Sequence, residues 1–276
     1  MYSAYLSAAA EIAREAGALL VRYFERRVVV EYKGDFDVVT EADRASESLI
    51  VDRLRARFPS HSIVAEEGSG VQNSSDFVWY VDPLDGTTNF AHGFPMFAVT
   101  LGLEHAGQLA AGVVYDPLRE EFFSAETGQG AYLNNRRLHV SRVNRMAESL
   151  LATGFPSRHR HADVNVYFYH QAAMLAHGVR RAGSAALDLC YVASGRLDGF
   201  WEFRLSPWDV AAGLLLVREA GGRYTDMRGA EHRIRGPELA ATNGLIHDEL
   251  IALFADVFGN RPRVPLPGLE APAPPP

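Results

Sequence analysis

The chain has 276 residues and a single cysteine, Cys190, so no disulfide can form within it. Few cysteines are typical of proteins in reducing compartments, and we expect a cytoplasmic location. Cys190 lies within an apolar helical pattern, which indicates a core residue. The ten histidines show no zinc-type spacing. Oxygen ligands, which prefer Mg²⁺ or Mn²⁺, are therefore the metal chemistry that this composition favours.

The sequence also lacks a long hydrophobic run and an excess of positive charge. Glu11, Arg14 and Glu15 interrupt the apolar residues near the start, which argues against a signal peptide, and no later run approaches the length of a membrane span. The formal net charge of −7 argues against a nucleic-acid surface spread over the whole protein. Basic clusters at 158–161 and 180–181 are either solvated or border an anionic substrate.

Apolar spacing divides the chain into two halves. Its first half predicts helices near 6–26 and 41–58, with strands at 28–32, 62–65, 77–81, 97–104, 109–115, 121–125, 130–133 and 138–140. Helices near 164–176, 185–194, 208–220 and 246–258 alternate with strands in its second half. We therefore predict an N-terminal α+β domain at 1–145, a C-terminal α/β domain at 146–260 and a disordered proline-rich tail at 261–276.

One stretch carries most of the functional signal. An apolar run at 77–81 predicts a strand buried on both faces, and it leads into the sequence Asp-Pro-Leu-Asp-Gly-Thr-Thr at 82–88. Pro83 fixes the backbone, so we expect the ladder to stop and the chain to turn sharply between Asp82 and Asp85, which lets both carboxylates converge. Gly86 allows close backbone approach, and the amides at 86–88 would open a short helix that favours an anion. A metal-assisted phosphate site explains this combination better than a simple helix cap.

Two other aspartates have a structural alternative. Asp43 stands three residues after Thr40, and Asp209 stands three residues after Ser206. Both spacings are typical of a capping box, in which the acid only holds the start of a helix. From these residues alone, capping is the simpler interpretation of each.

A second group of polar residues also allows two interpretations. Glu66 and Glu67 end an apolar run, and adjacent side chains of a strand point to opposite faces, so we expect one to face a site and the other to support it. Glu202 ends an aromatic strand and could be a plain surface acid. Ser184 is either a routine N-cap or, with the amides of its helix, a contact for the polar groups of a substrate.

These motifs occur together in an order that resembles the inositol monophosphatase family, over about residues 5–258. They are Glu66-Glu67, the 82–88 stretch, Gly183-Ser184-Ala185-Ala186 and Trp208-Asp209, and the bacterial inositol-1-monophosphatase type is the most similar. The resemblance implies a layered α-β-α-β-α sandwich of the inositol monophosphatase and fructose-1,6-bisphosphatase type. It also implies a homodimer and lithium-sensitive hydrolysis of phosphate monoesters with Mg²⁺, or Mn²⁺ in its place.

The resemblance further implies roles for individual residues. The metal ligands would be Glu66, Asp82, the carbonyl of Leu84, Asp85 and Asp209. Asp43 and Thr87 would position the attacking water, and Glu67 would orient metal-bound water. Lys33 matches a family lysine near the metals. The substrate contacts would be Glu66, Leu84, Asp85, Gly86, Thr87, Arg180, Ser184, Ala185, Glu202 and Asp209.

The leaving group stays open at this point. Glu202 favours a polyol such as inositol, although its carboxylate could also receive the ammonium of histidinol phosphate; fructose bisphosphate and 3′-phosphoadenosine nucleotides are further alternatives. An alternative of another class is a regulatory protein that binds RNA or a transcription complex, a role in which bacterial members of the family also act. The basic clusters are its sequence support, but such a binder would not need metal ligands, so we expect neither nucleic acid nor membrane as a partner.

Overall fold

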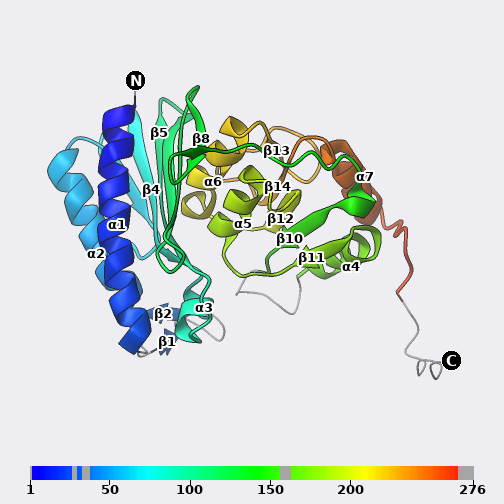
Figure 1. Cartoon of the computed structure of the whole chain (residues 1–276), viewed down its shortest axis with the longest axis horizontal. Helices are drawn as coiled ribbons and strands as arrows, with labels where there is room; N and C mark the ends of the chain where they lie inside the picture. Colours follow the sequence, from blue (N-terminus) through cyan, green and yellow to red (C-terminus); the bar gives the residue numbers. More distant parts are fainter. Residues whose placement is uncertain (1, 27–29, 33–37, 156–162, 267–276) are drawn as a thin grey trace.

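The computed structural model describes residues 2–26, 30–32, 38–155 and 163–266 (Figure 1). Two strands, β1 (Val30–Tyr32) and β2 (Val38–Thr40), form a small antiparallel sheet. The remaining elements of the first half are α1 (Ser3–Arg26), α2 (Glu41–Arg57), β3 (Ser62–Ala65), β4 (Phe77–Asp85), α3 (Thr87–Ala91), β5 (Ala98–His105), β6 (Gln108–Asp116), β7 (Glu121–Glu126), β8 (Gly130–Leu133) and β9 (Arg136–Arg137).

The seven-stranded sheet runs in the order β3-β4-β5-β6-β7-β8-β9. Only the β3–β4 pair is parallel, so the predicted antiparallel meander from 97 to 125 is confirmed. The strand predicted at 138–140 is wrong, because the last strand is β9 and the chain then leaves the sheet. Leu138 still donates its N–H to Ala131 at 2.8 Å, whereas Val140 donates its N–H to Ala220 at 3.2 Å.

The second half builds a five-stranded sheet in the order β11-β10-β12-β14-β13. Its helices begin and end within about two residues of the limits that the apolar spacing predicts. None of the helices in the described ranges is long and apolar enough to cross a membrane. The elements are η1 (Met146–Glu148), β10 (Leu150–Thr153), α4 (Asn165–Leu175), β11 (Gly178–Arg180), α5 (Ala185–Ala193), β12 (Gly199–Phe203), α6 (Pro207–Glu219), β13 (Arg223–Thr225), β14 (Glu238–Thr242) and α7 (His247–Phe258).

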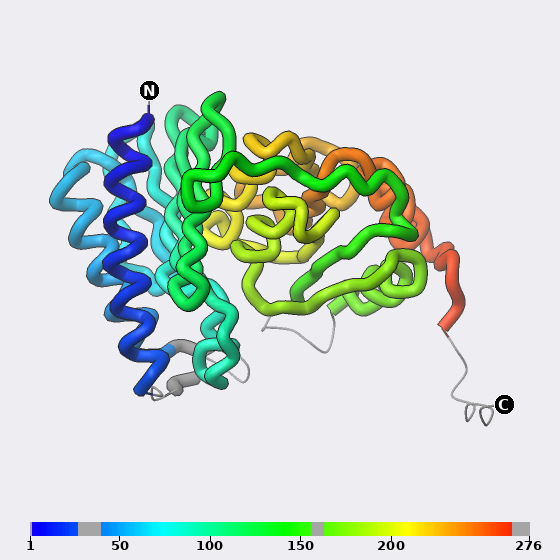
Figure 2. The backbone as a smooth tube through the Cα atoms, viewed as in Figure 1, coloured from blue at the N-terminus to red at the C-terminus, as the bar shows by residue number. Residues whose placement is uncertain are grey.

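Helices and sheets alternate as layers across the molecule. Figure 1 shows α1 and α2 on the outer face of the seven-stranded sheet, α5 and α6 between the two sheets, and α4 and α7 on the far face of the five-stranded sheet. The tube in Figure 2 follows the chain through these layers from the α1 side to the α7 side. The predicted α-β-α-β-α sandwich is therefore confirmed.

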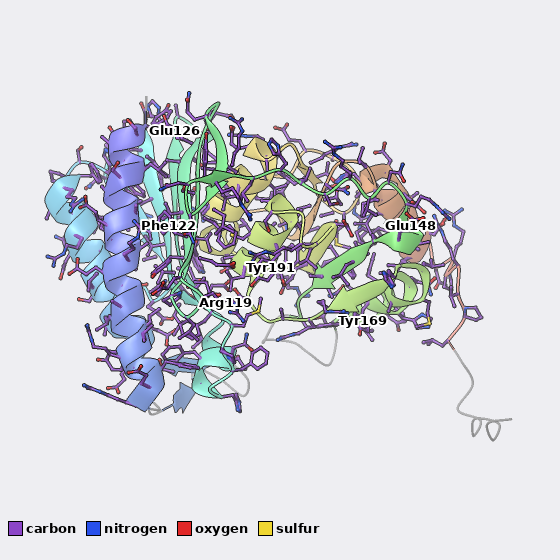
Figure 3. All side chains as sticks on the ribbon, in the orientation of Figure 1. Arg119, Phe122, Glu126, Glu148, Tyr169 and Tyr191 are labelled. Carbon is purple, nitrogen blue, oxygen red and sulfur yellow. The ribbon has the colours of Figure 1, made fainter. Side chains whose placement is uncertain are left out.

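The first and last described segments are both tied to the layers. The N–H of Tyr2 donates to Glu126 at 2.7 Å, and Arg14 of α1 lies 4.1 Å from the ring centre of Phe122; both β7 residues face α1 in Figure 3. At the other end, Val264 exchanges two hydrogen bonds with the side chain of Gln171 at 2.6 and 2.9 Å. Ordered structure thus continues past 261, where the disordered tail is predicted to begin, while 267–276 lie outside the described residues.

Helix α6 packs unusually close to the seven-stranded sheet. A Cβ atom added to Gly102 would lie 2.5 Å from the Cβ of Ala211, and one added to Gly112 would lie 2.8 Å from the Cα of Ala212. We call this contact between α6 and strands β5 and β6 the central seam. Because β5 pairs with β4, the seam fixes α6 relative to the acids at the end of β4.

Candidate active site

Strand β4 carries two of the predicted site residues, Asp82 and Asp85. The prediction that the strand stops at Asp82 is wrong: Asp82 pairs with Thr100 and Asp85 pairs with Ala98, so one extra residue forms a bulge between them. Residues three apart on a regular strand point to opposite faces, and an extra residue cancels that alternation. The bulge around Pro83 therefore does what we expected of a turn, since it lets both carboxylates reach the same region.

Helix α2 places Asp43 beside this bulge. Asp43 accepts the N–H of Thr40 at 2.8 Å, so the predicted capping box is confirmed. Its other oxygen lies 3.0 Å from the hydroxyl of Thr87, which is also 3.0 Å from the carbonyl of Leu84. Burial raises the pKa of the Asp43 carboxyl. One aspartate thus holds a helix start and contacts the predicted catalytic threonine.

Two further residues of α2 hold the site, and the sequence reasoning missed both. The hydroxyl of Ser46 donates to the carbonyl of Pro83 at 2.9 Å. The carboxylate of Glu47 accepts the N–H groups of Glu67 at 2.6 Å and Ser69 at 2.8 Å. Ser46 lies three residues and Glu47 four residues after Asp43, so all three share the buried face of the helix. Polar residues at those spacings on an otherwise apolar face were the available signal.

The residue after Asp85 must be glycine for steric reasons. Gly86 has a φ of 94°, and a Cβ atom there would lie 2.8 Å from the carbonyl oxygen of Met96. It precedes α3, so the predicted short helix that the residues at 86–88 open is confirmed. The absence of a side chain lets this loop pack tightly against the segment that leads into β5.

Asp85 also connects the two halves of the chain. It accepts hydrogen bonds from the hydroxyl of Ser184 and, at 2.9 Å, from the N–H of Ala186, at the start of α5. Ser184 additionally accepts the N–H of Leu187 at 3.3 Å, so the N-cap interpretation of Ser184 is confirmed together with a contact to the site. Burial raises the pKa of Asp85 to about 6 against the opposing effect of these donors.

The charges of four predicted metal ligands act on one another. Burial raises the pKa of Asp82 well above its usual value, and the charges of Glu66, Asp85 and Asp209 raise it further. The pKa of Asp209 rises to about 8, through burial and then the charge of Asp85. The described part of the chain therefore gathers negative charge here, and none of the main influences on these three aspartates is a described cation.

This donor set fits a divalent cation. Hard cations such as Mg²⁺ prefer carboxylate and carbonyl oxygens, and a bound cation would relieve the mutual repulsion. Within the residues that the structure describes, no three His, Cys, Asp or Glu side chains are arranged to hold an ion as they stand. The acids instead accept backbone N–H groups: Asp82 from Leu84, Asp85 from Ala186 and Asp209 from Ser206.

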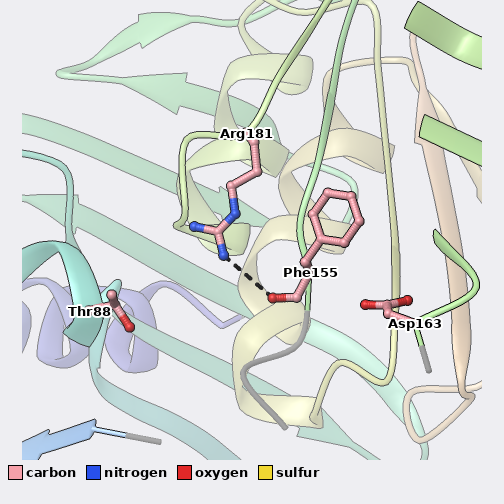
Figure 4. Close-up of a pocket in the computed structure, with 4 residues that line it drawn as sticks. All are labelled: Thr88, Phe155, Asp163 and Arg181. Carbon is pink, nitrogen blue, oxygen red and sulfur yellow. Dashed lines mark hydrogen bonds between the residues drawn. The ribbon is translucent and has the colours of Figure 1, made fainter. Parts of the chain in front are cut away.

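A cavity of about 450 Å³ adjoins the 82–88 stretch. Thr88, Phe155, Asp163 and Arg181 line it, and Figure 4 shows Thr88 on one side and Asp163 on the other. The Arg181 guanidinium lies 3.4 Å from the carbonyl of Phe155. The sequence pointed to Arg180 at the mouth, but the structure brings its neighbour into the lining, since adjacent side chains diverge. Arg180 folds back towards Gly178.

Glu202 is buried rather than exposed, with an exposed fraction of 9%, so the surface-acid alternative is wrong. A Cβ atom on Gly154 would lie 2.0 Å from its carboxylate oxygen, which means that Glu202 lies directly over that glycine. Burial raises the pKa of Glu202 to about 8, and the charge of Asp188 adds to the effect. The predicted Lys33 and the basic cluster at 158–161 lie outside the described residues.

Comparisons with known proteins identify related sequences and related folds. A model of the inositol monophosphatase family matches residues 1–257. The Nus factor SuhB of Pseudomonas aeruginosa is 46% identical over 246 residues, which cover 86% of this chain and 91% of that protein. An inositol-1-monophosphatase of Mesorhizobium japonicum is 43% identical over 254 residues, covering 90% and 95%. A solved inositol monophosphatase from Anabaena has a TM-score of 0.84 and 42% identity, covering 92% of this chain and 96% of that one.

Proposed function

From the premise that the chain belongs to the inositol monophosphatase family, whose members are phosphatases, we propose that it is a Mg²⁺-dependent hydrolase of a small phosphorylated polyol. Inositol 1-phosphate is the substrate that we propose first. The observation that carries this proposal is a group of mutually repelling acids beside a cavity, with Asp82 and Asp85 buried on β4 and partly buried acids contributed by the loop after β3 and by α6.

The family uses divalent metal ions. In this chain we assign them to Glu66, Asp82, the Leu84 carbonyl, Asp85 and Asp209, with Mn²⁺ as a possible substitute for Mg²⁺. When bound, such ions supply positive charge to the phosphate and lower the pKa of a water molecule. Phosphate monoester hydrolysis is among the slowest uncatalysed reactions, so charge neutralisation and positioning must supply most of the rate.

The chain itself provides groups that relay a proton and orient the attacking water. The Thr87 hydroxyl is placed to accept a hydrogen bond from the attacking water while it donates to Asp43. The buried Asp43 carboxyl, with its raised pKa, can take up a proton more readily than an exposed aspartate. Glu67 is held through its own N–H by Glu47, which fixes the segment that also carries Glu66.

The alcohol half of the substrate would lie against the second half of the chain. Ser184, the Ala185 amide and Glu202 offer hydrogen-bonding groups for hydroxyls, and Arg181 offers a cation at the cavity wall. Glu202 is buried against Gly154, so the backbone there limits the movement of its carboxylate in that direction. This arrangement supports a polyol more strongly than an apolar alcohol.

Phosphate release from a panel of monoesters tests the proposal. The panel contains inositol 1-phosphate, histidinol phosphate, fructose 1,6-bisphosphate and 3′-phosphoadenosine 5′-phosphate, each with Mg²⁺ and with a chelator. We expect release from inositol 1-phosphate that requires the metal. Faster release from histidinol phosphate would reassign the substrate within the same chemistry. No release from any member of the panel would refute the hydrolase assignment.

The relatives named Nus factor favour one alternative of another class, a regulatory protein that binds RNA or a transcription complex. The exposed Arg180 and Arg181 are the described basic residues that support it. Nucleic-acid binding must weaken steeply as salt rises, because bound phosphates release counterions. Steep salt dependence of RNA binding, combined with no phosphate release under Mg²⁺, would favour this alternative.

We also propose a cytoplasmic homodimer. Val166, Tyr167 and Met174 of α4 are more than half exposed and give that helix an apolar outer face, which supports self-association. Sedimentation equilibrium would test the proposal, since a monomer at micromolar concentration would contradict it.

A further inference from the structure

Asp163 uses only half of its carboxylate for structure. It precedes α4, and its Oδ1 accepts the N–H of Asn165 at 2.9 Å, which is a helix-capping contact. Its Oδ2 is buried and has no hydrogen-bond partner among the described residues. A buried carboxylate oxygen without a partner is costly, so it calls for an explanation beyond capping.

The cavity supplies that explanation. Asp163 lines it together with Phe155 and Arg181, opposite Thr88, whose segment belongs to the proposed phosphate end (Figure 4). Asp163 therefore lies at the end of the cavity where the alcohol part of a substrate must extend. Phe155 and the Arg181 guanidinium stand between the two ends, so a substrate that spans the cavity passes beside them.

Other acids lie close enough to this region to act on one another. The described charges that act on Glu202 come from Asp188, Asp85 and Asp163, with Arg181 as an opposing cation. Asp188 is only 2% exposed, and in the described part of the chain its Oδ1 also has no partner. A donor on the alcohol would satisfy such oxygens, whereas a second phosphate or carboxylate would meet like charge.

We propose that Asp163 is a specificity-determining residue whose free Oδ2 accepts a hydrogen bond from the alcohol part of the substrate. The site then takes phosphate monoesters whose alcohol carries hydroxyl or ammonium donors, and it discriminates against esters with a second anionic group. This inference rests on the proposed phosphatase function. It goes beyond that function because it assigns selectivity to a residue outside the acidic motifs.

The variant Asp163→Asn separates this role from capping. Asparagine keeps the size of the side chain and an oxygen for the Asn165 N–H, but it replaces the free acceptor by a donor. A second variant, Asp163→Ser, can still cap the helix while its shorter side chain leaves the cavity. The matched control is Asp226→Asn: Asp226 accepts the N–H groups of Arg228 and Ala230 at 2.9 and 2.8 Å in a turn between β13 and β14, outside the cavity lining.

The readout compares inositol 1-phosphate with fructose 1,6-bisphosphate, as the ratio of the constant measured for the first compound to that measured for the second. It is measured as kcat/KM with Mg²⁺ and separately as Kd by titration calorimetry, with thermal unfolding as a check of folding. We expect the kcat/KM ratio of inositol 1-phosphate to fructose 1,6-bisphosphate to fall, and the corresponding Kd ratio to rise, by about tenfold or more in Asp163→Asn and Asp163→Ser, through KM rather than kcat. Both ratios should stay unchanged in the control. Histidinol phosphate distinguishes an ammonium from a hydroxyl donor. The kcat/KM for histidinol phosphate should fall more in the Asp163 variants than the kcat/KM for inositol 1-phosphate.

The outcomes distinguish a failure of the specificity role of Asp163 from a failure of the phosphatase function. Turnover with ratios that stay within about twofold in both Asp163 variants would overturn the specificity role and leave the phosphatase intact. No turnover in the wild type would refute the phosphatase function, and the Kd ratios would then decide the role of Asp163 on their own. A Kd ratio that Asp163→Asn leaves unchanged would overturn it in that case too.

Discussion

Replacing Glu47 by alanine should destabilise the folded protein and weaken its binding of Mg²⁺. Glu47 is 1% exposed, and its carboxylate accepts the N–H groups of Glu67 and Ser69 at 2.6 and 2.8 Å. Hydrogen bonds to a charged group contribute about 1.5–3 kcal/mol each, so two would contribute about 3–6 kcal/mol. Both bonds are only partly buried, and water can replace part of them, which leaves an expected loss of about 2–4 kcal/mol.

The loss should reach the proposed metal site because the same loop carries Glu66. Without Glu47, the loop after β3 keeps the bond from the Glu66 N–H to the Val81 carbonyl, at 3.2 Å, but it loses both anchors that follow. Urea unfolding with and without Mg²⁺ measures both effects, since a ligand that binds only the folded state stabilises it by an amount that rises with the logarithm of its affinity. Glu47→Gln keeps one acceptor and should give an intermediate loss.

A surface glutamate provides the control. Glu15 pairs with Arg53 at 2.7 Å, and both side chains are well exposed, so Glu15→Ala should change stability far less. Two results would show that α2 does not hold the loop through Glu47. One is a free energy of unfolding of Glu47→Ala within about 1 kcal/mol of the wild type, and the other is a stabilisation by Mg²⁺ equal to that of the wild type.

Three further variants test other parts of the structure. Asp209→Asn should abolish turnover and the stabilisation by Mg²⁺ while leaving metal-free thermal stability equal or higher, because it removes a partly buried charge that repels Asp85. Undiminished turnover would contradict this. Gly154→Ala should raise KM for the polyol by about tenfold or more, since its Cβ would displace the Glu202 carboxylate, and partial rescue by Glu202→Asp in the same chain would support that cause. Burial lowers the pKa of His247 in the folded protein to about 4. The neutral imidazole therefore contributes fully to the stability of the folded protein above pH 6.5, and this contribution is lost as the pH falls towards 4. The stability difference between wild type and His247→Gln should therefore shrink by about 2 kcal/mol across that window in urea titrations, and a constant difference would refute the assignment.

Local signals explain what the sequence could predict. The starts of α2 and α6 follow from Thr40 with Asp43 and from Ser206 with Asp209, because a capping box involves only four consecutive residues. The course of β4 does not follow in this way. Pro83 indicated a break, but whether the strand resumes depends on β5, which is distant in the sequence and pairs again at Asp85.

Side-chain direction limits the rest of the site prediction. Choosing between Arg180 and Arg181 requires the register of β11 against β10, which no local pattern provides. Glu47 looks like an ordinary helix acid until the loop that it holds is known. Asp163 likewise matches a capping residue, and only the cavity shows that its second oxygen is free in the described structure.

The acids lie beside the central seam, and the packing of the seam must offset their mutual repulsion. Asp82 and Asp85 belong to the first half of the chain and Asp209 belongs to the second, so their repulsion pushes the halves apart when no cation is bound. The contacts of Ala211 and Ala212 with Gly102 and Gly112 oppose that push. These contacts involve short, rigid groups, which cannot yield as long side chains do. The layers can therefore hold the acids close without an ion, at a cost in stability that the proposed metal ion would remove.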